Sequence, residues 1–228
     1  MQGVTFYAVA DHAILVQLGT DVSEALSERV QKLDRAIAAN PPLGLLETVP
    51  AFVNLLAKFD PLVTDHGEME SEVRALLSAN VQDQKQASTH EVPVCYDRDF
   101  APDLEAVAKA TDMSEEAVIS MHLSGAYSVG MYGFAPGYAY LSGVPSPMQV
   151  PRKATAIRDI PAGRVLIAGP QCLVTTLKMP TGWSIIGSSP TQVLQNDPDN
   201  PFLFDVGDRV QFRRVDRASY EELIKGRT

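Results

Sequence analysis

The chain begins with two apolar runs, which are followed by an apolar stripe of helical period. Val4–Ala10 and Ala13–Leu18 predict two antiparallel strands joined by a tight turn. A helix is expected next, with Asp21 and Glu24 as an acidic start of the capping-box type and Asn40 as its end before two prolines. Its apolar side chains recur at steps of three and four, as a core-facing stripe requires: Val22, Leu26, Val30, Leu33 and Ile37.

The same order of patterns occurs a second time further along the chain. Leu45–Val49 and Phe52–Phe59 predict two more strands. Met69, Val73 and Leu76 then mark the buried side of a second amphipathic helix. Two successive strand-strand-helix units predict a small ferredoxin-like α+β domain over residues 1–85.

A polar segment separates this domain from the rest of the chain. Residues 80–90 are nearly devoid of large apolar side chains, which is typical of a linker or an exposed crossing segment. Beyond it we expect a strand at Val92–Cys95, helices at Asp103–Ala110 and after Ser114, and then mainly strands and turns. Short apolar runs between Gly and Pro residues predict a β-barrel domain over residues 90–228.

Gly and Pro are most concentrated between Tyr132 and Trp183. Gly133 and Gly137 permit positive φ and Pro136 fixes φ, so the start of this segment is expected to be a loop of defined shape. Aromatic side chains interleave the loop: Phe134, Tyr138 and Tyr140. Composition alone favours a well-packed turn beside the core over a ligand-binding surface, and both interpretations stay open at this point.

Several separate blocks of sequence follow one another along the second half of the chain. They are Gly133-Phe134-Ala135-Pro136-Gly137, Val150-Pro151-Arg152-Lys153, Ile160-Pro161-Ala162-Gly163, Ile167-Ala168-Gly169-Pro170-Gln171 and Trp183-Ser184-Ile185-Ile186-Gly187. In order and spacing these blocks resemble the carboxyltransferase subdomain family of allophanate hydrolase subunit 1, KipI and the 5-oxoprolinase B subunit. The resemblance extends from about Asp11 to Phe212. It implies that the C-terminal barrel is cyclophilin-like.

The chain departs from the family pattern within these blocks. Tyr138 stands where the family usually has Phe, Thr181 where it has Gly, and Ser188-Ser189 where it has Arg-Thr. The missing guanidinium at Ser188 removes a bidentate donor for a carboxylate or phosphate. We therefore expect Arg152 to carry more of the substrate binding, and the resemblance does not fix the substrate.

Composition and charge narrow the class of protein. The chain has 228 residues, is 45% hydrophobic and carries a formal net charge of −9, which argues against nonspecific binding to nucleic acid or an anionic membrane. A secretory signal is missing from the start and no apolar run approaches the ~18 residues of a membrane span, so a cytoplasmic location is expected. Cys95 and Cys172 stand alone, and we expect two buried thiols and no metal site.

Three polar side chains are the candidates for catalysis. His122 is a candidate proton carrier, or else caps the carbonyls at a helix end. Arg152 follows a proline and is a candidate for holding a carboxylate or a carboxyphosphate-like group, against a surface ion pair. Gln171 offers an amide to a lactam or ureido group, or bonds its own turn. Neither a Ser-His-acid triad nor a Walker loop accompanies them.

The substrate is expected to contact the shaped loop and the turn before the last block. The candidate substrate-binding residues are Phe134, Pro136, Gly137, Tyr138, Tyr140, Gly182 and Trp183. The aromatic members are candidates for cavity walls or for simple filling of the barrel, and for Trp183 a structural role is favoured. We also expect Arg152 and Gln171 to face one cavity together with the loop.

The family resemblance implies an enzyme component that is inactive alone. The expected function is that of the B subunit of an ATP-dependent 5-oxoprolinase, which opens the lactam of 5-oxoproline to give glutamate. Its expected partners are a carboxyltransferase-like protein of the C-subunit type and a LamB/YcsF-like protein of the A-subunit type, and ATP would be engaged by the assembled complex. Two alternatives are half of a biotin-dependent urea carboxylase-type carboxyltransferase and a KipI-like inhibitor of a sensor histidine kinase.

Overall fold

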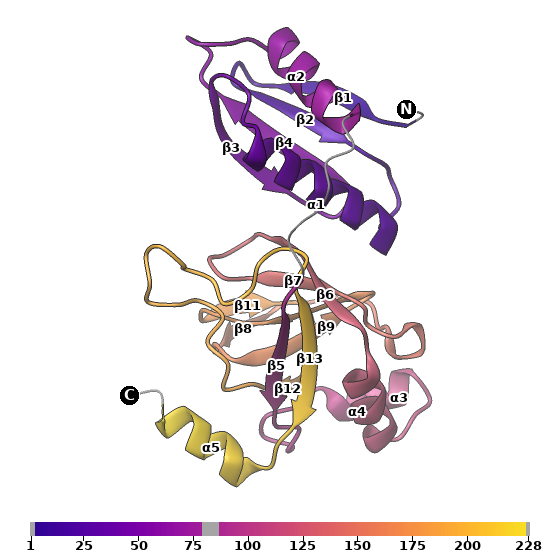
Figure 1. Ribbon diagram of the computed structural model, residues 1–228. Coiled ribbons are helices and arrows are strands. Elements are labelled where there is room, and N and C mark those ends of the chain that lie inside the picture. Colours follow the sequence, from indigo (N-terminus) through magenta and orange to yellow (C-terminus); the bar gives the residue numbers. More distant parts are fainter. Residues whose placement is uncertain (1–2, 79–86, 227–228) are drawn as a thin grey trace. The chain divides into compact units, whose positions relative to one another are not determined.

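The computed structural model describes residues 3–78 and 87–226. The chain divides into two compact units, Met1–Gln86 and Ala87–Thr228 (Figure 1). Each unit combines helices with a sheet and has a hydrophobic core of its own. The protein therefore belongs to the α+β class, as predicted.

The predicted linker, residues 80–90, meets the described structure only at its end. Residues 80–86 lie outside the described residues. His90 already belongs to strand β5 (Thr89–Val94), where it is the register partner of Val210, so the predicted linker is too long. The polar sequence was misleading because β5 begins with polar side chains that are only partly covered.

The N-terminal unit contains four strands and two helices. In chain order these are β1 (Thr5–Val9), β2 (Ala13–Gln17), α1 (Glu24–Ala39), β3 (Leu45–Pro50), β4 (Asn54–Phe59) and α2 (His66–Ser78). The sheet has the order β1-β2-β4-β3, and every neighbouring pair is antiparallel. Because α1 connects β2 to β3 across the intervening β4, the unit has the split βαβ arrangement of ferredoxin-like domains.

Both helices of this unit cover one face of the sheet and share a core with it. Val30, Leu33 and Ile37 of the predicted stripe are buried there. The predicted helix start at Asp21 is wrong, because the N-cap is Ser23, whose hydroxyl accepts a hydrogen bond from the Leu26 amide at 3.3 Å. A serine hydroxyl at this position satisfies an amide that has no partner within the helix.

The C-terminal unit is dominated by strands, with short helices at its margins. In chain order its elements are β5, α3 (Leu104–Ala110), α4 (Glu115–Ser124), β6 (Tyr127–Tyr132), β7 (Ala139–Ser142), the 3-10 turn η1 (Ser146–Met148), β8 (Ile157–Ile160), β9 (Arg164–Ala168), β10 (Gln171–Val174), β11 (Met179–Thr181), β12 (Ser184–Ser188), β13 (Arg209–Arg214) and α5 (Arg217–Lys225). Helix α5 was not predicted, because Tyr220 is its one buried side chain and no buried stripe runs along it.

Seven strands form a nearly closed, cyclophilin-like barrel in the order β12-β9-β10-β7-β6-β13-β5. The two edges meet at Cys95 and Ser188, which exchange backbone hydrogen bonds of 2.8 and 2.9 Å. Strands β13 and β5 are parallel, and the other neighbouring pairs of this sheet are antiparallel. Closure removes the exposed sheet edges on which other chains could pair. Strands β8 and β11 form a separate two-stranded ribbon.

Alternation along β9 and β10 gives the barrel wall two apolar faces. Val165 and Ile167 of β9, with Val174 of β10, belong to the main core inside the barrel. The intervening Leu166 and Leu173 are register partners and belong to a second cluster on the other face of the same strands. Because side chains alternate across a sheet, an apolar surface also lies on the outer face of the barrel. Other residues of the second cluster, among them Tyr138 and Trp183, pack against it.

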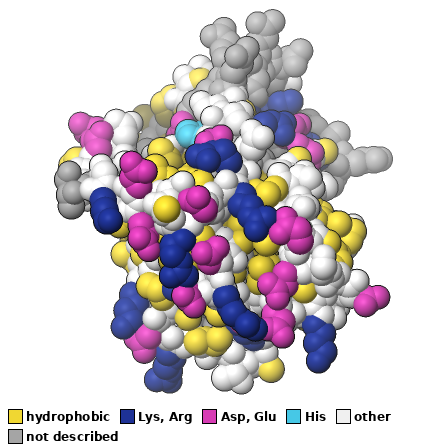
Figure 2. Space-filling view, turned by 90° about the horizontal axis from the view of Figure 1, so that it is seen from below, with side chains coloured by type: hydrophobic (Ala, Val, Ile, Leu, Met, Phe, Trp, Pro, Cys, Tyr) yellow, Lys and Arg dark blue, Asp and Glu magenta, His cyan; other side chains and the backbone are white. Residues whose placement is uncertain are grey.

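The prediction of two buried thiols is confirmed, and the surface is mixed in charge. Cys95 and Cys172 are both free and buried. The face in Figure 2 shows Lys and Arg side chains intermixed with Asp and Glu, which differs from the single-sign basic patch of a nucleic-acid-binding surface. Within residues 3–78 and 87–226, no helix is both long and apolar enough to cross a membrane.

Candidate functional site

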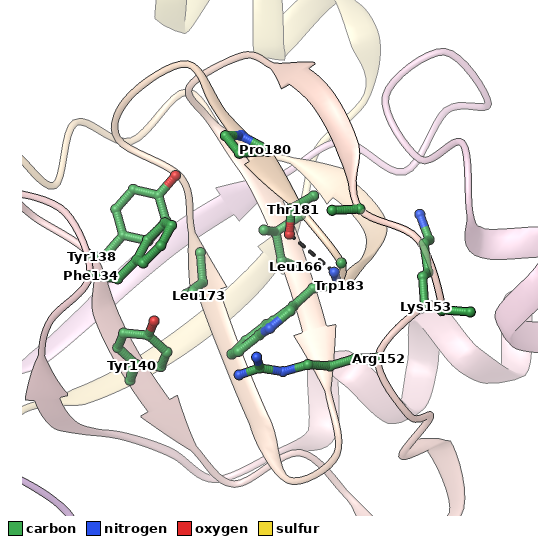
Figure 3. Close-up of a pocket in the computed structure, with 13 residues that line it drawn as sticks. Phe134, Tyr138, Tyr140, Arg152, Lys153, Leu166, Leu173, Pro180, Thr181 and Trp183 are labelled. Atoms are coloured by element: carbon green, nitrogen blue, oxygen red, sulfur yellow. Dashed lines mark hydrogen bonds between the residues drawn. The ribbon is translucent and has the colours of Figure 1, made fainter.

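A cavity of about 380 Å³ lies on the outer face of the barrel wall. Its size falls within the range of small-molecule sites. It brings together the loop after β6, the segment before β8, the outer face of β9 and β10, and the turn between β11 and β12 (Figure 3). The lining residues are Phe134, Tyr138, Tyr140, Arg152, Lys153, Ala154, Ala156, Leu166, Leu173, Pro180, Thr181, Gly182 and Trp183.

The floor of the cavity is apolar. Leu166 and Leu173 project from neighbouring strands, and Trp183 at the start of β12 is buried against them with only 6% of its surface exposed. The Trp183 amide donates to the Thr181 hydroxyl at 3.1 Å, which fixes the turn that presents the indole. Trp183 therefore has a structural role, as favoured from the sequence, and it also lines the cavity.

Aromatic rings form one side of the cavity. Tyr140 meets Trp183 edge to face at 5.8 Å between ring centroids, and Phe134 meets Tyr138 at 5.7 Å. Burial raises the pKa of both tyrosines, and for Tyr140 the nearby Arg152 guanidinium opposes that effect. The two phenols are therefore protonated at neutral pH. The Tyr138 hydroxyl donates to the Leu177 carbonyl at 3.5 Å, whereas the Tyr140 hydroxyl can donate a hydrogen bond to a ligand.

The loop after β6 is held in a strained shape at the cavity mouth. Phe134 has φ of +67°, a value that is uncommon for a residue other than glycine, and its side chain is exposed. Gly137 has φ of +75°, and a Cβ there would lie 2.9 Å from the Thr176 methyl. The Pro136 carbonyl accepts a hydrogen bond from the Thr176 hydroxyl at 2.6 Å. Pro136 and Gly137 therefore shape the loop, whereas Phe134 reaches the cavity; strain of this kind is concentrated at functional sites.

Two cations line the cavity, and their surroundings differ. The Arg152 guanidinium lies 5.5 Å from the centre of the Trp183 ring, a cation–π arrangement. No carboxylate among residues 3–78 and 87–226 is within ion-pair distance of Arg152. Lys153, in contrast, donates from Nζ to Asp103 Oδ2 at 2.5 Å, and its amide donates to the Gly182 carbonyl at 2.7 Å. The surface-ion-pair interpretation of Arg152 therefore has no support in the described structure.

Negative charge is missing from the lining, although the chain as a whole carries a net charge of −9. Arg152 and Lys153 are the charged residues of the cavity wall, and the remaining lining residues are aromatic, aliphatic or hydroxyl-bearing. A positive cavity in an acidic protein attracts anions selectively. The lining is therefore suited to a small anion that has a flat or apolar body.

Among the predicted catalytic residues, Arg152 lies in the cavity, whereas His122 and Gln171 lie outside its lining. Gln171 occupies the β9–β10 hairpin end, where it pairs with Ser142 and Ala168. Gln171 is two residues before Leu173 on β10, so both side chains lie on the outer face of the barrel wall. Leu173 lines the cavity, whereas Gln171 lies beyond its end. The expectation that Arg152 and Gln171 share one cavity is therefore wrong.

His122 belongs to α4, and its side chain is fully buried in the core. Its Nδ1 is 2.7 Å from the Tyr96 hydroxyl and its Nε2 is 3.7 Å from Cys172 Sγ, and its ring packs 4.4 Å from that of Phe212. Burial lowers its pKa to about 3, so the imidazole is neutral at physiological pH. These contacts differ from the predicted capping of helix-end carbonyls, and they give His122 no route to the cavity.

Ser188 also lies away from the cavity, at the closure of the barrel. Its hydroxyl accepts from Arg164 Nη1 at 2.7 Å and donates to the Phe100 carbonyl at 3.0 Å. The structure therefore does not support the argument that a guanidinium missing at Ser188 shifts substrate binding onto Arg152. Lys153 and the two floor leucines are cavity residues that the sequence argument missed, although Lys153 directly follows Arg152 in the chain.

Comparison with known proteins agrees with this architecture. Residues 4–204 match the model of the carboxyltransferase domain, subdomain C and D, and the chain belongs to that family. It is 33% identical over 223 residues to the 5-oxoprolinase B subunit of Bacillus subtilis (strain 168), covering 93% of each chain. The match with the 5-oxoprolinase B subunit of Escherichia coli O157:H7 is 30% over 215 residues, covering 93% of this chain and 96% of the other.

Solved structures give the same fold. The crystal structure of TTHA0988 superposes with a TM-score of 0.79 at 33% identity, over 90% of this chain and 40% of that one, so this chain spans less than half of TTHA0988. The Kluyveromyces lactis urea carboxylase has a TM-score of 0.75 at 19% identity, over 97% of this chain and 22% of that one. This second likeness concerns the fold alone.

Proposed function

We propose that this chain is the B subunit of an ATP-dependent 5-oxoprolinase and that the cavity beside Trp183 binds 5-oxoproline. The observation that carries the proposal is the Arg152 guanidinium, which has no carboxylate partner in the described structure and lies over an aromatic floor. 5-Oxoproline has one carboxylate on a small flat lactam ring, which matches one cation beside an indole. Two relatives that align along 93% of this chain are named as B subunits of 5-oxoprolinase.

In this proposal the cavity residues bind and orient the substrate. Arg152 holds the carboxylate by charge-assisted hydrogen bonds, and Trp183 supports the ring face. The protonated hydroxyl of Tyr140 is available to the lactam carbonyl, where negative charge grows when the amide bond is attacked. Holding the ring in this way lowers the entropic part of the barrier.

The cavity is not equipped for the rest of the reaction. Its lining contains no carboxylate, imidazole or thiol that could accept a proton from water. Its single uncompensated cation does not fit the triphosphate of ATP, which proteins bind with several converging donors and a metal ion. We therefore assign ATP and proton transfer to partners in a cytoplasmic complex, namely a carboxyltransferase-like protein of the C-subunit type and a LamB/YcsF-like protein of the A-subunit type.

Exposed apolar side chains lie next to residues that line the cavity and provide a surface for such a partner. Phe134 is itself a lining residue, and the Leu177 carbonyl accepts from the Tyr138 hydroxyl. Phe134, Ile157 and Leu177 are 67%, 42% and 38% exposed, and Ile157 is the register partner of the lining residue Thr181. Apolar rims of this kind mark protein interaction sites. The same rim favours a second candidate function, a KipI-like inhibitor of a sensor histidine kinase, for which Arg152 would not be needed.

The experiment that tests the proposal is reconstitution of the three purified proteins with 5-oxoproline and ATP. We expect glutamate release and ATP hydrolysis only when all three are present, because this chain offers binding groups without a proton acceptor. Omission of each protein in turn is the control. Turnover by this chain alone, or a stable complex that leaves 5-oxoproline unchanged, would contradict the proposal. Inhibition of kinase autophosphorylation by Arg152→Ala as well as by the wild type would support the second candidate.

A further inference from the structure

The contacts of Lys153 carry an inference about ligand selectivity that rests on the proposed function. Lys153 lines the cavity, yet its ammonium group forms an ion pair with Asp103, a residue outside the lining. The two side chains are 22% and 16% exposed, so water screens the pair only partly. Figure 3 shows the side chains of Arg152 and Lys153 diverging, with the guanidinium beside Trp183.

Asp103 is itself held in place by the backbone of the barrel. Its Oδ2 accepts from the Ile185 amide at 2.7 Å as well as from Lys153, and its own amide donates to the Ile185 carbonyl at 3.0 Å. One of these bonds to Ile185 holds the carboxylate and the other holds the backbone of Asp103, so the residue is fixed against β12 without Lys153. A carboxylate held in this way is a fixed partner for the lysine.

We infer that Asp103 is a specificity-determining residue, because it compensates Lys153 and leaves the cavity with a single effective positive charge. The cavity then selects ligands with one carboxylate and discriminates against dicarboxylates and phosphates, whose second charge has no partner. Discrimination arises because a charge that loses water without gaining a partner is unfavourable. Asp103 does not touch the ligand in this account and acts through Lys153.

Trp183 makes the inference measurable on the isolated chain. It is the only tryptophan of the sequence, and it forms the cavity floor. Its fluorescence therefore reports ligand binding without partner proteins and without turnover. The probes are 5-oxoproline, with one carboxylate, and glutarate, with two carboxylates and the same number of carbon atoms, titrated at constant ionic strength.

The informative variant is Asp103→Asn. An asparagine oxygen still accepts from the Ile185 amide, but it no longer neutralises Lys153. We expect glutarate to bind about three- to tenfold more tightly than to the wild type, the size of one partly exposed ion pair, with little gain for 5-oxoproline. The double variant Asp103→Asn with Lys153→Met restores one effective charge, and we expect it to restore the wild-type preference.

The variant Lys153→Met changes the charge in the opposite direction and covers the case in which Asp103→Asn fails to fold. It leaves Asp103 uncompensated beside the cavity, so glutarate should lose more affinity than 5-oxoproline. A glutarate to 5-oxoproline ratio that stays at the wild-type value in the folded variants would overturn this inference alone. Titrations of the wild type that match those of Arg152→Ala would overturn the proposed substrate site, and the inference with it.

Discussion

Arg152 and Lys153 show how two adjacent cations come to have different roles. Lys153 is tied to Asp103 and to the Gly182 carbonyl, so it joins the segment before β8 to the turn that carries Trp183. Arg152 has the indole beneath it and no carboxylate partner in the described structure. A guanidinium supported by an aromatic ring is preorganised for a planar carboxylate. We therefore propose that Arg152 binds the ligand and that Lys153 holds the site together.

At the residue scale, His122 gives a prediction about pH. Burial lowers its pKa to about 3, whereas an unfolded histidine titrates near ~6.5. Between these values the unfolded chain binds a proton that the folded chain does not, so the free energy of unfolding falls as pH decreases, by at most about 1.4 kcal/mol per pH unit. We expect His122→Gln to lose this part of the pH dependence in urea denaturation between about pH 6.5 and pH 3.

The wild type, measured in urea over the same pH range, is the control. Carboxylates also titrate at the acid end of the range, so the comparison concerns the difference between wild type and variant. Equal slopes for the wild type and His122→Gln would show that the buried histidine is not responsible.

At the scale of elements, burial on one face decided which strands and helices the sequence could predict. The core stripe of α1 and the runs in β9 and β10 are periodic because each packs one side against a core. The β8–β11 ribbon was not predicted, because most of its side chains are exposed or half-buried. Where no face is buried, the sequence has no periodic pattern to detect.

The cavity could be predicted only in part, for a related reason. The aromatic loop and Arg152 stand out locally by residue type, and both reach the cavity. The role of Lys153 differs from that of Arg152 because Lys153 is paired with Asp103. Asp103 is 50 residues away in sequence, so the pairing depends on the folded barrel. Gln171 and His122 have chemically suitable side chains, but their places in the hairpin and the core follow from strand register and helix packing.

At the scale of the whole molecule, we propose that the two units are independent domains with a boundary near residue 87. Ser88 donates from its amide to Asp208 and accepts from the Arg209 amide, so the barrel begins before the predicted residue 90. We expect residues 87–228 to fold alone, with dispersed amide resonances and a cooperative melt. A fragment that begins at residue 96 is the control.

That shorter fragment lacks β5, which pairs with β13, and lacks the Cys95 bridge that closes the barrel. It should therefore fail to fold, because an open barrel exposes two sheet edges and its core. A cooperative melt for the shorter fragment would mean that closure through β5 is dispensable. No cooperative transition for residues 87–228 would mean that the C-terminal unit is not a domain.

The central claim is that Arg152 anchors the substrate carboxylate in the assembled 5-oxoprolinase. The most direct test is kcat/KM for 5-oxoproline in the reconstituted complex with Arg152→Ala, beside the thermal melt of the variant chain. Arg98, which is exposed and paired with Glu105, provides the control substitution Arg98→Ala. An Arg152→Lys variant tests whether a positive charge without the guanidinium geometry is sufficient to bind the substrate carboxylate.

We expect Arg152→Ala to lower kcat/KM about tenfold to a hundredfold, because a hydrogen bond to a charged group contributes ~1.5–3 kcal/mol. Stability should change by less than about 1 kcal/mol, as for an exposed cation, and Arg98→Ala should change neither quantity appreciably. Arg152→Lys should recover part of the activity. An Arg152→Ala complex with wild-type kcat/KM, or one whose activity falls only as far as its folded fraction falls, would contradict the account.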